Sequence, residues 1–212
     1  MTAAEGVRGG PDAVRASWRN TTHDWAAEVD HAHLDAVRRA PETYAPGGVH
    51  HLVLEVLAYA ADEAECTGGG RARVTLHADG SVSVTDDGRG TDTRLDAAGH
   101  PVKKPVMATK DLRFFDAPDT PALPDGHPRR GMSVVAALSD RLTHTNRRAG
   151  GSWTQRYEHG VPVTDLDPLP DDGTTGTRVH FHPAAGLTAA SGAGLTDWPA
   201  HLTVAVERET AH

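Results

Sequence analysis

The sequence predicts an α+β fold, a two-layer sandwich in which helices cover one face of a single mixed, largely antiparallel sheet. Three observations predict it. Apolar residues recur at helical spacing in residues 23–39 and 49–66. They alternate with polar residues in 71–85, on either side of an Asp-Gly turn. A third helical segment, 131–142, is followed by further alternating segments.

The helical segments have clear ends. Residues 40–48 hold two prolines and a pair of glycines, so we expect a loop between the first two helices. Three consecutive glycines, 68–70, end the helix that begins near residue 49. Residues 91–130 are irregular, with a short helix near 105–111. We expect residues 131–142 to be a helix whose buried side carries Val134, Val135, Leu138 and Leu142.

The strands follow from alternation and turns. Asp79-Gly80 is a typical hairpin turn between two short strands. A second hairpin turns at residues 149–151, and strands are expected at 174–183 and in the tail, 198–210. We expect residues 1–22 to be flexible and residues 23–212 to form one domain.

Composition excludes several classes of protein. A formal charge of −8 argues against sequence-independent binding to nucleic acid, which needs many lysines and arginines. One cysteine excludes a disulfide framework and fits a reducing compartment. No apolar run reaches the ~20 residues that a membrane helix needs, and no signal peptide is visible. We expect a cytoplasmic protein without membrane contact.

Fourteen histidines raise the question of a metal site. His31 and His33 are two residues apart, and His50 and His51 are adjacent, which are not the spacings of known metal motifs. We therefore predict no metal site.

Several segments, in this order, resemble the ATP-binding domain of type II topoisomerases, above all that of the DNA gyrase B protein. These are HHLVLEVLAYAADEA, VTLHADGSVSVTDDGRG, GMSVVAALSDRL, YEHGVP and TGTRVHF. That domain belongs to the superfamily of Hsp90, MutL and histidine kinases, whose shared architecture is the Bergerat (GHKL) fold. The resemblance implies this fold and, as ligand, ATP or ADP.

The resemblance assigns one group of residues to an adenine pocket. Asp86 matches the aspartate that accepts a hydrogen bond from the adenine amino group, and Thr177 matches its supporting threonine. Gly88 and Gly90 complete the Asp-x-Gly-x-Gly turn, where glycine lets the backbone approach the base. The remaining expected members are Arg89 (paired with Glu63), Arg148 and Asp62.

The resemblance also assigns a catalytic group. Glu55 matches the general base that polarises the attacking water, and His51 matches the histidine that assists it. The alternative is that His51 is an ordinary helix residue satisfied by solvent.

The chain departs from the family pattern where the phosphates would lie. Tyr59 replaces the asparagine that ligates Mg²⁺, and a phenol is a poor ligand for that ion. The phosphate loop, Gly-x-His-Gly-x-Gly in the family, reads GHPRRGMS here, with Arg129 in place of a glycine and Arg130 after it. The two arginines either hold an anion through their side chains or form a solvated charged loop. Phe114 falls near the place of a family lysine, with Arg113 beside it.

These departures predict a stand-alone, degenerate ATPase. It would bind an adenine nucleotide, or another small molecule in that pocket, without efficient hydrolysis, and Mg²⁺ is not expected. The chain is read as ending before the transducer domain that supplies a catalytic lysine in gyrase. Two alternatives stay open: an enzyme that uses Glu55, Tyr59 and His51 for new acid–base chemistry, and a regulatory scaffold.

Overall fold

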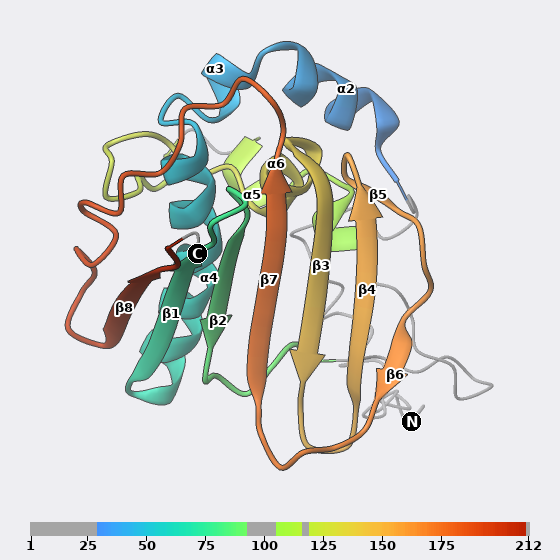
Figure 1. Cartoon of the computed structure of the whole chain (residues 1–212), viewed down its shortest axis with the longest axis vertical. Helices are drawn as coiled ribbons and strands as arrows, with labels where there is room; N and C mark the ends of the chain where they lie inside the picture. The colour runs from blue at the N-terminus through green and yellow to red at the C-terminus, as the bar shows by residue number, and fades with distance from the viewer. Residues whose placement is uncertain (1–28, 93–104, 116–118, 211–212) are drawn as a thin grey trace, which may run out of the picture.

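The computed structural model describes residues 29–92, 105–115 and 119–210 (Figure 1). Eight strands of these residues form one sheet, in the order β5-β4-β3-β7-β2-β1-β8, with β6 beside β4. The helices lie together on one face of the sheet, which is seen from its open face in Figure 1. The predicted α+β class is confirmed. The predicted flexible segment, 1–22, lies outside the described residues.

The bounds of the elements follow. The helices are α2 His31–Arg39, α3 Pro41–Tyr44, α4 Val49–Thr67, η1 Pro105–Met107, α5 Leu112–Phe115 and α6 Met132–Ala137. The strands are β1 Gly70–Leu76, β2 Val82–Asp86, β3 Ser139–Arg147, β4 Ser152–Glu158, β5 Val161–Pro162, β6 Asp167–Leu169, β7 Gly176–Pro183 and β8 Leu202–Arg208.

Helix α4 is the central element of the core. It contains no proline or glycine, and most of its side chains are buried against β1, β2 and β8. Gly68 ends it with a left-handed φ of 82°, a conformation that glycine adopts without strain. Because α4 is buried on several sides, its residues Glu55 and His51 are shielded from solvent.

The predicted hairpin is present. Strands β1 and β2 pair antiparallel, with Leu76 opposite Val82, and Gly80 takes a φ of 83° in the turn. Strand β8 pairs parallel to β1, so the last strand returns to the outer edge of the first hairpin. This parallel pair makes the sheet mixed.

Three predictions about elements need correction. The helix expected over 131–142 ends at Ala137, because the Leu138 carbonyl accepts the Ala184 amide and the chain then enters β3. Leu142 is buried as predicted, but in a strand. The predicted loop 40–48 contains the one-turn helix α3, which tolerates proline because Pro41 occupies its first turn.

A buried histidine fixes α2 to α6. His33 Nε2 lies 2.9 Å from Ser133 Oγ, and its ring meets Phe115 edge-on. Burial lowers the pKa of His33 to about 4, although nearby Asp30 opposes the shift. The imidazole is therefore neutral at pH 7.

This pKa predicts a loss of stability in acid. The folded pKa lies below the unfolded value of 6.5, so the unfolded chain binds the proton first. The contribution of His33 is complete above pH 6.5 and is lost as the pH falls towards 4, by up to about 3 kcal/mol. Urea unfolding at several pH values should show a shallower acid slope for His33→Gln than for the wild type. Equal slopes would contradict this assignment.

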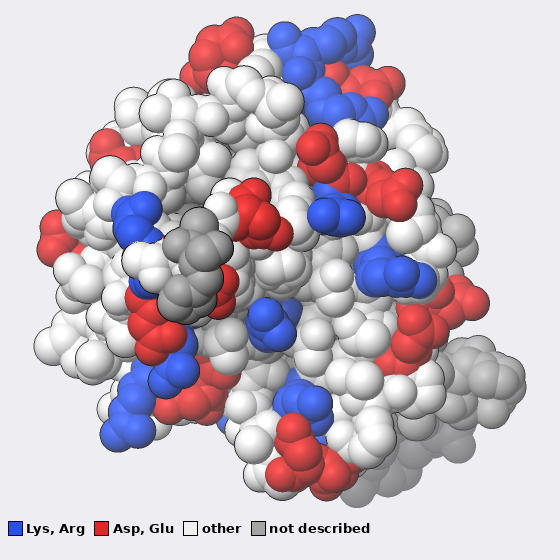
Figure 2. Space-filling model, viewed as in Figure 1, with Lys and Arg blue, Asp and Glu red and all other residues white. Residues whose placement is uncertain are grey.

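Charged side chains of both signs are mixed on the open face of the sheet. Lysine and arginine are interspersed with aspartate and glutamate across the view in Figure 2. A continuous basic surface, the usual footprint of nucleic-acid binding, is therefore not present on the face shown. None of the described helices is long and apolar enough to cross a membrane.

Candidate functional site

The adenine-type half of the site is built at the adjacent ends of β2 and β7. Asp86 Oδ1 accepts the Gly88 amide (2.9 Å) and the Thr177 amide (3.3 Å), and Oδ2 accepts the Thr177 hydroxyl. A carboxylate offers about four acceptor positions, so these three bonds from described residues leave one for a ligand donor. Burial raises the pKa of Asp86, although the bonds from Thr177 and Gly88 oppose the shift.

The backbone around Asp86 requires glycine at two positions. A Cβ on Gly176 would lie 2.0 Å from the Asp86 carbonyl oxygen, and the φ of Gly176 is 122°. A Cβ on Gly90 would lie 2.3 Å from the Arg147 carbonyl oxygen, at a φ of 75°. Glycine is therefore required at position 90, because the chain there lies directly against the end of β3, where the second hairpin turns. Gly176 was not singled out from the sequence, although the Thr-Gly-Thr motif contains it.

The expected arginine contacts flank this end of the site. Arg89 forms the predicted bidentate pair with Glu63, with Nε–Oε1 and Nη2–Oε2 distances of 2.6 and 3.0 Å. Arg148 donates to the Gly90 carbonyl at 3.1 Å. Both arginines thus hold the Asp-x-Gly-x-Gly turn in place.

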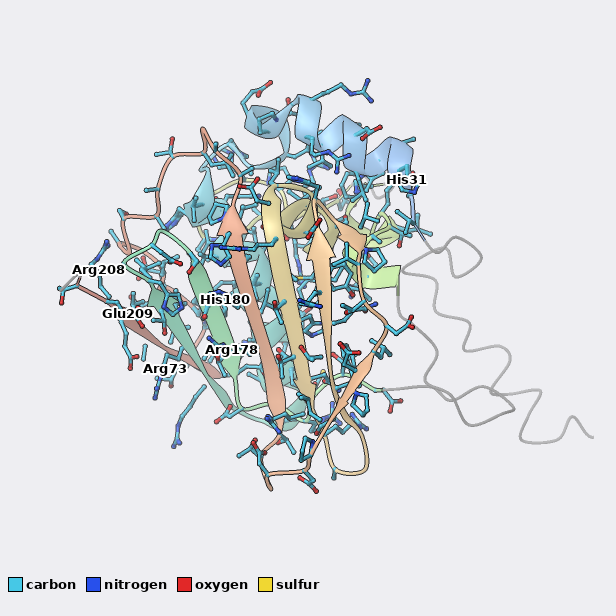
Figure 3. All side chains as sticks on the ribbon, turned by 45° about the vertical axis from the view of Figure 1, so that its right-hand side comes forward. His31, Arg73, Arg178, His180, Arg208 and Glu209 are labelled. Atoms are coloured by element: carbon cyan, nitrogen blue, oxygen red, sulfur yellow. The ribbon has the colours of Figure 1, made fainter. Side chains whose placement is uncertain are left out.

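A cavity lies between the helices and the sheet next to Thr177. Its floor is a row of paired residues on neighbouring strands, Val179, His144 and Gln155. Arg178 and His180 project on the open face (Figure 3), so alternation turns Thr177 and Val179 towards the helices. The other lining residues are Val56, Tyr59, Thr91, Val106, Met107, Met132, Trp153 and Tyr157. No Asp, Glu, Lys or Arg belongs to this described lining.

The carboxylate of Glu55 binds the backbone amides at the start of α6. It is fully buried, its Oε1 accepts the Arg130 amide, and its Oε2 accepts the Gly131 amide at 2.7 Å. Such amides form a natural anion site at a helix start. Here an internal carboxylate fills it.

His51 lies between two carboxylates. Its Nδ1 is 2.7 Å from Asp125 Oδ2 and its Nε2 is 3.4 Å from Glu55 Oε1. Burial alone would lower the pKa of His51, but the interactions with Glu55 and Asp125 outweigh it and raise the pKa. The alternative of a histidine satisfied by solvent is wrong, because the side chain is fully buried.

The hydroxyl of Tyr59 is bonded to an aspartate outside the expected catalytic pair. Its hydroxyl donates to Asp111 Oδ2 at 3.1 Å, and Asp111 also accepts from Arg113 at 2.6 Å. Burial, together with the charge of Asp111, raises the pKa of Tyr59 well above its ordinary value. The phenol therefore stays protonated and acts as a donor.

Arg129 fills the space beside Tyr59. Its guanidinium lies 4.5 Å from the ring centres of both Tyr59 and Phe114, and it pairs with Asp62 at 2.8 and 3.1 Å. The residue is 6% exposed, so the interpretation of a solvated loop is wrong for it. Its charge is met by the carboxylate of Asp62, which is itself half exposed.

The second loop arginine is also held within the protein. Arg130 Nη1 donates to the Phe114 carbonyl at 3.3 Å, and its guanidinium lies 5.5 Å from the Phe115 ring centre.

Phe114 was singled out only through a loose alignment, and Asp111 and Asp125 not at all. Both aspartates lie in the irregular stretch 91–130, where no periodic pattern marks buried residues. Within the described ranges, no group of three potential metal ligands comes together.

The fold matches that of the ATP-binding domains of type II topoisomerases. A solved example is the topoisomerase IV ATP-binding domain of Francisella tularensis, in complex with a small-molecule inhibitor. It superposes with a TM-score of 0.57 at 28% identity, covering 71% of this chain and 41% of that one.

The chain is homologous to the B proteins of DNA gyrase and topoisomerase IV. It is 40% identical over 152 residues to the gyrase B protein of Mycolicibacterium smegmatis and 38% over 165 residues to the mitochondrial gyrase B protein of Arabidopsis thaliana. It is 36% identical over 155 residues to the topoisomerase 4 B protein of Bacillus subtilis. The matches cover 70–71% of this chain but only 22–24% of these relatives. No family model matches the chain. The predicted resemblance is confirmed.

Proposed function

We propose that this protein binds an adenine nucleoside or nucleotide, or a compound of similar shape, without efficient ATP hydrolysis. One observation carries the proposal: Arg129, paired with Asp62, packs against Tyr59, and Tyr59 and Arg129 stand at the positions where the family pattern has its metal ligand and its phosphate loop. The homologous gyrase and topoisomerase proteins make an adenine ring the first ligand to test.

The ring-binding half has the chemistry for a flat heterocycle with an amino group. Asp86 keeps an acceptor position next to Thr177, and a hydrogen bond to a carboxylate is among the stronger ones in proteins. Thr177 also belongs to the lining of the cavity, whose walls are apolar or neutral. A ring can therefore lie in the cavity while its amino group reaches Asp86.

The phosphate half has the wrong charges for a triphosphate. A general base must reach an attacking water, but both oxygens of Glu55 accept backbone amides and the side chain is fully buried. Arg129 is neutralised by Asp62, and Arg113 is neutralised by the buried Asp111, so neither charge is free for a phosphate. Phosphates placed here would have to displace these contacts.

Binding of adenosine tests this proposal. Asp86→Asn removes the negative acceptor and should weaken adenosine binding by about 10- to 100-fold, because hydrogen bonds to charged groups contribute about 1.5–3 kcal/mol. Isothermal titration calorimetry measures the change. Asp87→Asn is the matched control, since this neighbouring carboxylate accepts the Arg71 amide and is not bonded to Thr177. Absence of adenosine binding in the wild type would overturn the proposal.

A further inference from the structure

The open face of the sheet carries a second constellation around Ser83, far from the helices. Val82 and Val84 are buried under the helices, so Ser83 between them faces the other way. Its Oγ lies 2.8 Å from His77 Nε2, 2.9 Å from His180 Nδ1 and 3.1 Å from Arg178 Nη2. Arg178, His180 and Glu209 are labelled on this side in Figure 3.

The partners of Ser83 fix the position of its proton. Glu209 Oε2 lies 3.1 Å from His77 Nδ1, so His77 carries its proton on Nδ1 and leaves Nε2 as an acceptor. Arg178 can only donate. A hydroxyl has one proton, which goes to His77, while the oxygen accepts from Arg178 and from His180 Nδ1.

His180 is suited to this role as a neutral donor. Burial lowers the pKa of His180, and the neighbouring charges of His182 and Arg178 act in the same direction. The Ser83 hydroxyl thus gives its proton to an imidazole that is supported by a carboxylate. This is the arrangement of an activated serine nucleophile.

A hollow of about 420 Å³ lies next to this constellation. His77 belongs to both, and the hollow is also lined by Asp79, Asp140, His182, Leu187 and Arg208. Small-molecule sites usually measure about 300–1,000 Å³. The hollow therefore has room for the body of a small substrate beside His77.

We propose that Ser83, His77 and Glu209 form a second, serine-hydrolase-type site that cleaves small activated esters. Ser83 and His77 are the catalytic residues, and Glu209 positions His77. This activity does not depend on the proposed binding of an adenine ring.

The chemistry balances with water as the only co-reactant. Ser83 Oγ attacks the ester carbonyl carbon while its proton moves to His77 Nε2, and Arg178, once released from Ser83, stabilises the oxyanion that develops on the carbonyl oxygen. The bond to the leaving alcohol breaks, and the alcohol takes the proton from His77. Water then attacks the acyl-serine, losing a proton to His77, and the acid departs as Ser83 regains that proton.

Access to Ser83 runs past Arg178. Ser83 is 3% exposed because the His77, Arg178 and His180 side chains crowd it, but Arg178 itself is exposed on the surface. Rotation of that one surface side chain opens the oxygen to a substrate.

Covalent labelling tests the site. A fluorophosphonate should attach to Ser83 with loss of fluoride, as seen by mass spectrometry of the peptide. Ser83→Ala should abolish the label, and Ser81→Ala, a hydroxyl two residues away that bonds Asp79, should keep it. His77→Ala should lower the labelling rate by about 100-fold or more, with partial rescue by added imidazole. An unlabelled wild type, or a label that persists in Ser83→Ala, would overturn the proposal.

Turnover of p-nitrophenyl acetate separates positioning from structure. Glu209→Gln should lower kcat while KM stays unchanged, because Glu209 is bonded to His77 and lies outside the hollow's lining. An unchanged kcat would remove Glu209 from the proposal. The Ser83→Ala variant should bind adenosine with wild-type affinity, and the Asp86→Asn variant should be labelled as the wild type is. The two proposed sites can therefore be contradicted independently of each other.

Discussion

Replacing Glu55 with alanine is expected to destabilise the protein by about 3–5 kcal/mol, the usual cost of removing one partner from a buried ion pair. The change deprives the Arg130 and Gly131 amides of their acceptor and leaves His51 beside Asp125 alone. Urea unfolding at constant pH measures the loss. Glu65→Ala, on an exposed position of the same helix, should change stability by less than about 0.5 kcal/mol.

The effect of Glu55→Ala should also depend on pH. Because the folded pKa of His51 is raised, its contribution is present below the unfolded value of 6.5 and is lost as the pH rises through the folded value. The difference between wild type and Glu55→Ala should therefore be larger at pH 6 than at pH 9. A loss below about 1 kcal/mol at both pH values would show that Glu55 is not the internal cap of α6.

Replacing Gly176 with alanine is expected to disrupt the junction of β2 and β7. The new Cβ would lie 2.0 Å from the Asp86 carbonyl oxygen, so one of the two strands must shift. We expect a loss of about 2–3 kcal/mol, since overpacking and a strained φ each cost about 1–3 kcal/mol. Adenosine binding should fall with it, because Thr177 and Asp86 would separate.

Gly173→Ala separates the clash from the backbone strain. Gly173 also has a positive φ, 77°, but a Cβ there would meet nothing within 4 Å. The Gly173→Ala variant should lose only about 1 kcal/mol of stability, the penalty of alanine in a left-handed conformation, and should keep adenosine binding. Equal losses in the two variants would mean that the contact with Asp86 does not matter.

The sequence predicted the grouping of residues around Asp86, because a local motif encodes it, while their role in binding an adenine ring stays a prediction. Asp86, Gly88 and Gly90 lie within five residues, so the turn itself brings them together. The hairpin with its Asp79-Gly80 turn was predicted for the same reason. Pairing of Arg89 with Glu63 followed from the resemblance and is present.

The phosphate half of the candidate site depends on long-range contacts that no local pattern reveals. Asp111 meets Tyr59, and Asp125 meets His51, across 52 and 74 positions of the chain. The burial of Arg129 also required knowing that Tyr59 and Phe114 flank it. The helix predicted over 131–142 was too long, because Leu138 and Leu142 fit helical spacing. In the structure, strand β3 begins at Ser139.

The ratio of the affinities for Mg-ATP and adenosine tests the central claim most directly. If Tyr59 and Arg129 fill the phosphate half, the triphosphate and Mg²⁺ should add less than about tenfold to the affinity of adenosine. Calorimetric titrations with each ligand, with and without Mg²⁺, provide the ratio. Binding of ATP that is strictly magnesium-dependent, more than about 100-fold tighter than that of adenosine, and followed by hydrolysis would contradict the account.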